Sequence, residues 1–191
     1  MNTSADIFYP KTKSAWRTWL IENHEKKNAI WVVLFKKKSN QPTISWSDAV
    51  EEALCFGWID SIKKTVDEDR SIQFFSKRKP KGTWSKINKQ RIQQLMETGR
   101  MFPAGLASVE TAKQNGSWSI LDDVEELIVP PDLEGALKKS GEAEAYFLSQ
   151  SRSKRKMLLH WVILAKRPET RRKRVDEIAN CAAEGKLPRG F

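Results

Sequence analysis

The sequence has little of the residues that build metal and redox centres: two cysteines and two histidines in 191 residues. Cys55 and Cys181 lie far apart, and His24 and His160 fall in separate predicted helices. No group of these residues has the spacing of a zinc or redox motif. We therefore predict no metal site and no cofactor, and we interpret Cys55, on an apolar helix face, as a plain buried thiol.

Long hydrophobic runs are also missing. No apolar stretch approaches the roughly 18–20 residues that a membrane-spanning helix needs, so we expect no membrane span. Residues 1–9 lack the basic start and apolar centre of a secretory signal. These features favour a cytoplasmic protein, in which a disulfide is disfavoured.

The chain is instead rich in tryptophan and in positive charge. Eight Trp and an apolar fraction of 39% are enough for one good core and a small second lobe. The net charge is +10. Residues 150–191 carry most of it, residues 77–91 form a basic strip, and residues 122–144 form an acidic strip.

The first part of the chain alternates helical and strand patterns. The hydrophobic periodicity predicts helices over 14–24, 46–56, 84–98 and 103–114, and strands over 29–36, 58–66 and 71–76. The last two strands flank a short polar turn and are expected to pair as a hairpin. We predict an α+β fold, in which a small antiparallel sheet packs with helices.

After residue 131 the pattern is helical only. We predict an α+β domain over 1–120, a linker over 121–131 and a helical C-terminal region over 132–191, packed on or beside the first domain. Its expected helices span 132–139, 142–148, 153–166 and 169–184.

Several long motifs resemble one bacterial family. They include the run Ala53-Leu54-Cys55-Phe56-Gly57-Trp58-Ile59-Asp60-Ser61, Trp84-Ser85-x-x-Asn88, and Ala165-Lys166-Arg167-Pro168-Glu169-Thr170-Arg171. On these residues the chain resembles the YdeI/OmpD-associated, bacteriocin-protection family over nearly its whole length. The resemblance implies a role in stress and bacteriocin tolerance but supplies no catalytic residues.

The strongest candidate site lies between the hairpin and the next helix. Free amide groups at a helix start favour an anion, and arginine binds carboxylate or phosphate through two parallel bonds. We predict a receptor for a small anionic ligand or an acidic protein partner. Its residues are Trp58, Asp60, Arg70, Arg78, Thr83, Trp84, Ser85 and Asn88.

Two other readings of these residues stay open. In the structural one, Asp60 and Asp67 pair with Arg70 and Arg78, and both tryptophans belong to the core. In the enzymatic one, Trp58 desolvates Asp60, which acts as a general acid or base. Asp60 has no evident nucleophile or oriented histidine beside it, so catalytic residues remain unassigned.

The basic C-terminal helices offer a nucleic-acid alternative. Clustered cations are the footprint of phosphate-backbone binding. The residues concerned are Arg155, Lys166, Arg167, Arg171 and Arg174. The acidic strip is an equally available partner within the chain, and no base-reading motif is present.

Overall fold

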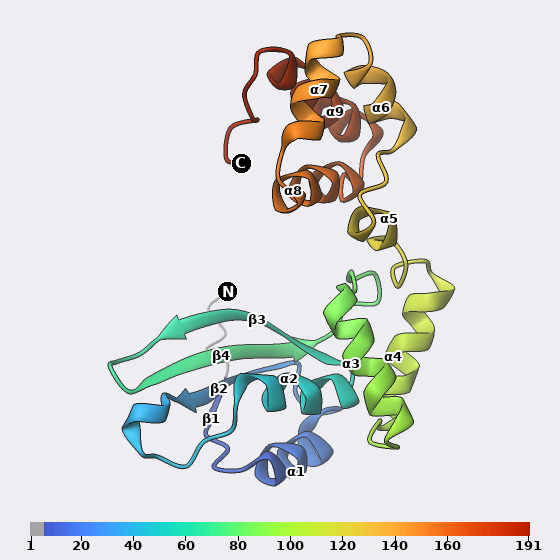
Figure 1. Cartoon of the computed structure of the whole chain (residues 1–191). Coiled ribbons are helices and arrows are strands. Elements are labelled where there is room, and N and C mark those ends of the chain that lie inside the picture. Colours follow the sequence, from blue (N-terminus) through green and yellow to red (C-terminus); the bar gives the residue numbers. More distant parts are fainter. Residues whose placement is uncertain (1–5) are drawn as a thin grey trace. The chain divides into compact units, whose positions relative to one another are not determined.

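The computed structural model describes residues 6–191, and it separates into two compact units that meet in sequence at Trp118 and Ser119 (Figure 1). Part of the stretch in which we looked for a secretory signal, residues 1–5, lies outside the described residues. Each unit has a hydrophobic core of its own.

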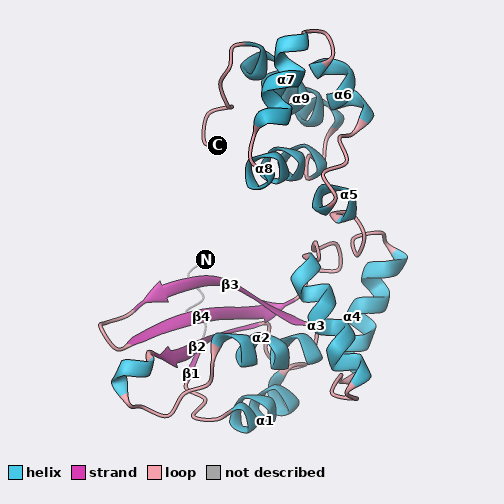
Figure 2. Ribbon diagram, in the orientation of Figure 1, coloured by secondary structure: helices cyan, strands magenta, loops and turns pink. Residues whose placement is uncertain are grey.

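The first unit is built on a four-stranded sheet with the order β1-β2-β4-β3 (Figure 2). Its strands are β1 (Ile7–Phe8), β2 (Ala29–Phe35), β3 (Trp58–Thr65) and β4 (Arg70–Lys77). The predicted hairpin is confirmed, because β3 and β4 pair antiparallel with Trp58 opposite Lys77. The sequence analysis missed β1, which adds a parallel edge to an otherwise antiparallel sheet.

Helices cover one face of this sheet. They are α1 (Lys13–Asn23) and α2 (Trp46–Cys55), and a short 3-10 turn lies at Lys37–Ser39. The helices α3 (Lys86–Glu97) and α4 (Pro103–Gln114) lie at one end of the sheet and pack on α2 (Figure 1). The inward residues Val32 and Phe75 are fully buried with Trp16 and Leu20 of α1. Buried and partly exposed residues alternate along much of β2 and β4, because successive side chains of a strand point to opposite faces of the sheet.

Local caps explain where the helices begin and end. The Ser45 and Ser85 hydroxyls accept hydrogen bonds from the Asp48 and Asn88 amides, at the starts of α2 and α3. Ser85 has extended backbone angles, so α3 begins at Lys86 and not at Trp84 as predicted. Gly57 follows α2 with φ +72°, a conformation that glycine adopts without strain.

The second unit is helical throughout its described residues. It contains α5 (Asp122–Glu125), α6 (Pro131–Leu137), α7 (Gly141–Ser149), α8 (Arg152–Ile163) and α9 (Pro168–Ala183). Its core extends into the stretch that the sequence suggested as a linker, since Leu121 and Val124 are buried in it. The predicted α+β class with a helical C-terminal region is confirmed.

Within residues 6–191, no helix has the length and apolar character needed to cross a membrane. The same residues contain no cluster of His, Cys, Asp or Glu suited to hold a metal ion.

Candidate functional site

A pocket of about 440 Å³ lies in the first unit where four elements converge. The end of α1, the turn from α2 into β3, the end of β4 and one side of α4 line it. The residues that matter most are His24, Phe56, Trp58, Arg78, Ala104 and Ser108. Exposed Glu25 and Lys77 also line it, so the pocket opens to solvent.

Three polar groups of this pocket lack hydrogen bonds. The indole Nε1 of Trp58, the Nε of Arg78 and the Nε2 of His24 are buried and find no partner among the described residues. Trp58 is fully buried and His24 is 7% exposed. A buried polar atom without a partner costs about 1–3 kcal/mol, so these three nitrogens are candidate positions for a bond to a ligand or to water.

The tautomer of His24 follows from its backbone contact. Its Nδ1 lies 2.9 Å from the carbonyl oxygen of Leu20, which can only accept, so Nδ1 carries the proton. In the neutral ring Nε2 is therefore an acceptor, and on protonation it becomes a donor. The Glu25 carboxylate lies 3.8 Å from Nε2, beyond hydrogen-bonding distance.

Arg78 is held firmly beside the pocket. Its Nη1 donates to the Thr83 carbonyl at 2.9 Å, and its guanidinium lies 3.6 Å from the centre of the Trp84 ring. Burial lowers the pKa of Arg78 to about 10, and the charge of Asp60 opposes that shift. Arg78 therefore keeps its positive charge at pH 7, with a hydrogen-bond donor, its Nε–H, to spare.

The backbone around the pocket is closely packed. A Cβ on Gly57 would lie 3.0 Å from the Ser108 Cβ and 3.1 Å from the Ala104 carbonyl oxygen. The Gly57 carbonyl in turn accepts from the Arg78 amide at 2.9 Å. Gly57 thus sets Trp58 and Arg78 side by side against α4.

The structure places only two of the predicted site residues in this pocket. Trp58 and Arg78 do line one pocket, but Trp84 is 2% exposed and stacks on the Arg78 guanidinium without lining the pocket. Both indoles belong to the core, as the structural reading predicted, and they do not together line a receptor at the start of α3. At the start of α3, the Ser85 hydroxyl accepts a hydrogen bond from the Asn88 backbone amide. The Thr83 carbonyl accepts one from Arg78.

Asp60 lies away from this pocket. Its carboxylate accepts from the Trp46 indole at 2.9 Å and from the Gln73 amide at 3.4 Å. It shares the inward face of β3 with Trp58, as its two-residue spacing predicts. Neither contact is with arginine, so the predicted structural pairing of Asp60 with Arg70 or Arg78 is not a direct one.

Arg70 is separated from Arg78 by the length of β4. It opens the strand at the hairpin turn, where its Nε donates to Asp67 at 2.6 Å. At about 3.3 Å per residue the two arginines lie more than 20 Å apart along the strand. Including Arg70 in the same receptor is therefore a mistake of the sequence analysis, because the turn places it at the opposite end of the hairpin.

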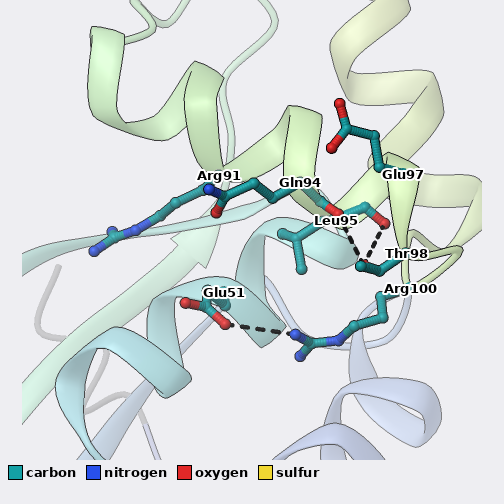
Figure 3. Close-up of a pocket in the computed structure, with 7 residues that line it drawn as sticks. All are labelled: Glu51, Arg91, Gln94, Leu95, Glu97, Thr98 and Arg100. Carbon is teal, nitrogen blue, oxygen red and sulfur yellow. Dashed lines mark hydrogen bonds and ion pairs between the residues drawn. The ribbon is translucent and has the colours of Figure 1, made fainter.

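A second pocket, of about 360 Å³, lies between α2 and α3 and contains paired charges (Figure 3). Arg100 donates a hydrogen bond to the Glu51 carboxylate at 3.5 Å. The Thr98 hydroxyl donates to backbone carbonyls of the preceding helical turn. The Glu51 carboxylate also receives Lys13 at 3.2 Å. Because these groups already satisfy one another, this pocket is the weaker candidate.

The next residue of α2 after Glu51, Glu52, is a buried carboxylate with two cationic partners. Glu52 is 2% exposed and accepts from Arg17 at 2.7 Å and from Arg100 at 2.5 Å. Burial raises the pKa of the nearby Cys55 thiol, and the charge of Glu52 adds to that effect. The triad ties α1, α2 and the segment after α3 together, and Cys55 remains a buried, unreactive thiol.

The basic residues of the nucleic-acid alternative do not form one free surface. Arg171 makes two bonds to Asp132, at 2.6 and 2.9 Å, and Arg174 donates to the Trp161 carbonyl. Lys166 and Arg167 are exposed, and the buried Nε of Arg155 has no partner among the described residues. Part of the acidic strip thus neutralises the tail, as the sequence suggested.

Sequence reasoning missed His24, although a signal was present. Trp16, Leu20 and His24 recur every four residues and so share the buried face of α1. Ser108 carried no such signal, because the close packing of α4 against the end of α2, at Gly57 and Gly105, brings it to the pocket.

The fold and the pocket define an α+β protein with a helical second unit and a small polar pocket in its first unit. The chain belongs to the family described as "Domain of unknown function (DUF8412)", whose model matches residues 8–108. Residues 126–185 match the family described as "Bacteriocin-protection, YdeI or OmpD-Associated". The predicted YdeI/OmpD-associated kinship is thereby confirmed in the second unit, while the motif over 53–61 falls within the first match. Comparisons with curated proteins and with solved structures give no significant match.

Proposed function

We propose that the first unit binds a small anionic ligand in the pocket beside Trp58 and Arg78. A carboxylate or phosphate oxygen would accept from the Trp58 Nε1–H and the Arg78 Nε–H. Both donors are pre-positioned, since Trp58 is packed in the core and Arg78 is held by Thr83 and Trp84. The observation that carries the proposal is that His24, Trp58 and Arg78 each leave a buried nitrogen unpartnered and line one pocket.

His24 and the pocket wall narrow the ligand further. In its neutral form His24 offers an acceptor, which suits a ligand hydroxyl or N–H beside the anionic group. Phe56 and Ala104 supply apolar surface. The volume of about 440 Å³ is in the range of small-molecule sites. The ligand class is therefore a small organic acid or phosphate ester with a neighbouring hydroxyl or amide.

The family that residues 126–185 match is described by bacteriocin protection, and this description motivates a proposal about the role of the ligand. We propose that the chain is a non-catalytic tolerance protein whose ligand binding is part of that response. Comparing the survival of bacteriocin-treated cells that produce the parent protein or its Trp58→Phe variant tests this. Equal protection by the two proteins would show that bacteriocin tolerance does not depend on ligand binding in the pocket.

Ligand-dependent thermal stabilisation tests the binding itself. A panel of hydroxy acids and sugar phosphates should include members that raise the Tm of the parent protein, because a ligand bound only to the folded state stabilises it. Trp58→Phe keeps an aromatic side chain, although a smaller one, and removes the N–H, so it should reduce that shift strongly. A panel without any effect on the parent would overturn the proposal.

Two matched variants control for indirect effects. Arg70→Gln removes an arginine that is paired with Asp67 at the far end of β4, and should leave the ligand-induced shift unchanged. Glu25→Gln removes a carboxylate that lines the pocket, and should strengthen binding of an anion. If Arg70→Gln weakened binding as much as Trp58→Phe, the site would lie elsewhere.

A further inference from the structure

The sheet of the first unit has an aromatic face that none of its helices covers. Helices α1 and α2 pack on the inward face (Figure 1). Trp31 and Phe74 lie opposite each other on the outward face, with ring centres 4.9 Å apart. Tyr9 and Phe35 form a second pair on that face at 5.0 Å. All four rings are partly exposed.

The charge of this outward face is positive. Lys64 lies opposite Ile72, and its Nζ is 4.9 Å from the centre of the Trp31 ring. Three exposed lysines, Lys36 to Lys38, follow β2 directly. The strands β2 and β4 contain no carboxylate, and the single one of β3, Asp60, points inward and bonds Trp46.

The acidic residues next to this face are Asp6, which precedes β1 and pairs with Lys27, and those of the hairpin turn between β3 and β4. In this turn Asp67 forms an ion pair with Arg70, while Glu68 and Asp69 are exposed. The two acids are outnumbered by the lysines after β2 and on β3. The surface thus combines flat aromatic rings with an excess of lysine.

From this combination we infer a second binding surface, for single-stranded nucleic acid, on the outward face of the sheet. Bases stack on exposed aromatic side chains in a sequence-tolerant way, while lysines contact the backbone phosphates. The two ring pairs are centred on Trp31 and Phe35, about 13 Å apart along β2, so they would take bases from one short strand. This surface is distinct from the pocket and from the basic C-terminal helices, and it does not rest on the proposed function.

Fluorescence anisotropy with a labelled oligonucleotide of about 8 nucleotides, within the usual site size, tests the inference on the full chain. The parent should bind at low salt, with an affinity that falls as salt rises. Trp31→Ala and Phe74→Ala should each weaken binding by about fivefold or more, as loss of a base stack does. Trp46→Ala is the matched control, since that indole is 44% exposed on another surface, and it should change nothing.

Two further measurements keep the result decisive. Inorganic polyphosphate of similar charge should compete poorly, because it has no bases to stack. Ultraviolet cross-linking of the unmodified protein should map to peptides of β2 and β4, whether or not the variants fold well. The inference is overturned if the parent does not bind at low salt. It is equally overturned if polyphosphate competes fully, or if the cross-links map to residues 150–191.

Discussion

Gly105 lies where α4 packs against the end of α2, and there only a hydrogen atom fits in place of a side chain. A Cβ at this position would be 2.1 Å from the Cys55 carbonyl oxygen. That same oxygen accepts a hydrogen bond from the Phe102 amide at 3.0 Å, so the two backbone segments cannot move apart without weakening this hydrogen bond. This contact brings α4, and with it Ser108, to the pocket.

We expect Gly105→Ala to lower the free energy of unfolding of the first unit by about 3 kcal/mol, in the upper range for overpacking. Gly135→Ala is its matched control in α6, where nothing lies within 4 Å of the added Cβ. That substitution should raise stability by up to about 1 kcal/mol, because alanine favours a helix. Chemical denaturation of both variants checks the opposite signs, and a neutral Gly105→Ala would contradict the close packing.

At the same scale, the sequence predicted some residues of the site and misplaced others. Trp58 and Arg78 were predicted together because they flank the hairpin, and antiparallel pairing keeps its two open ends adjacent. Arg70 was misplaced for the same reason, since it sits at the closed end. The burial of Trp84 agrees with the structural reading, in which both tryptophans belong to the core. Its contacts are with nearby Arg78 and with Trp118, which follows α4, and the second contact could not be predicted from local sequence.

At the scale of elements, the second unit is fastened by an ion pair between the start of α6 and the start of α9. Arg171 donates two bonds to Asp132, and the hydrogen bond from Arg171 is the main cause that lowers the pKa of Asp132. A carboxyl whose folded-state pKa is depressed stabilises the fold above its unfolded pKa. That contribution disappears as the pH falls through the folded-state value.

Asp132→Asn should therefore destabilise the second unit at pH 7 but leave it nearly unchanged well below pH 3. The Asp132 side chain is 43% exposed, so we expect a difference below about 1 kcal/mol at pH 7. Glu169→Gln, in the first turn of α9, is the control: it removes a carboxylate outside the Asp132–Arg171 pair and should show no comparable pH dependence. Thermal unfolding across pH 2–7 measures both. A constant effect of Asp132→Asn at all pH values would contradict the ion-pair account.

Most element types were predicted from periodicity, whereas several boundaries were not. The hairpin and the helix over 103–114 were correct because apolar spacing and Pro103 mark them clearly. The strand β1 is two residues long and gains its identity from pairing with β2, which no local pattern reveals. The helix predicted over 153–166 ends at Ile163, before the Arg167-Pro168 break that the sequence used as its limit.

At the scale of the whole molecule, two hydrophobic cores occupy separate stretches of the chain. The first draws its buried residues from 16–112 and the second from 121–182. Two different family descriptions match these stretches. We therefore expect each unit to contain the information for its own fold.

Expression of residues 6–118 and of residues 119–191 as separate proteins tests this. Each should unfold cooperatively, with circular dichroism typical of α+β and of helical structure respectively. The second fragment has about 70 residues, a size at which a single core gives only modest stability. A second fragment without a cooperative transition, or a first fragment that fails to fold alone, would show that the cores depend on each other.

The same division bears on function. The pocket and the aromatic sheet face both lie within the first unit, so the isolated fragment 6–118 should retain both activities if it folds. The clustered positive charge of the C-terminal helices suggested nucleic-acid binding as an alternative, but this charge is partly neutralised by the acidic strip. Where the excess charge acts could not be predicted, because ion pairing depends on tertiary contacts.

The most direct test of the pocket is nitrogen-15 NMR of the indole and guanidinium groups in the full chain. Titration with the ligand found by thermal stabilisation should shift the Trp58 Nε1–H and Arg78 Nε–H resonances, assigned through Trp58→Phe and Arg78→Lys. The Trp16 indole, bonded to the Ala49 carbonyl at 3.0 Å, should stay unchanged. Movement of the Trp58 and Arg78 signals together would support a shared ligand. Unmoved signals at saturating ligand would contradict it.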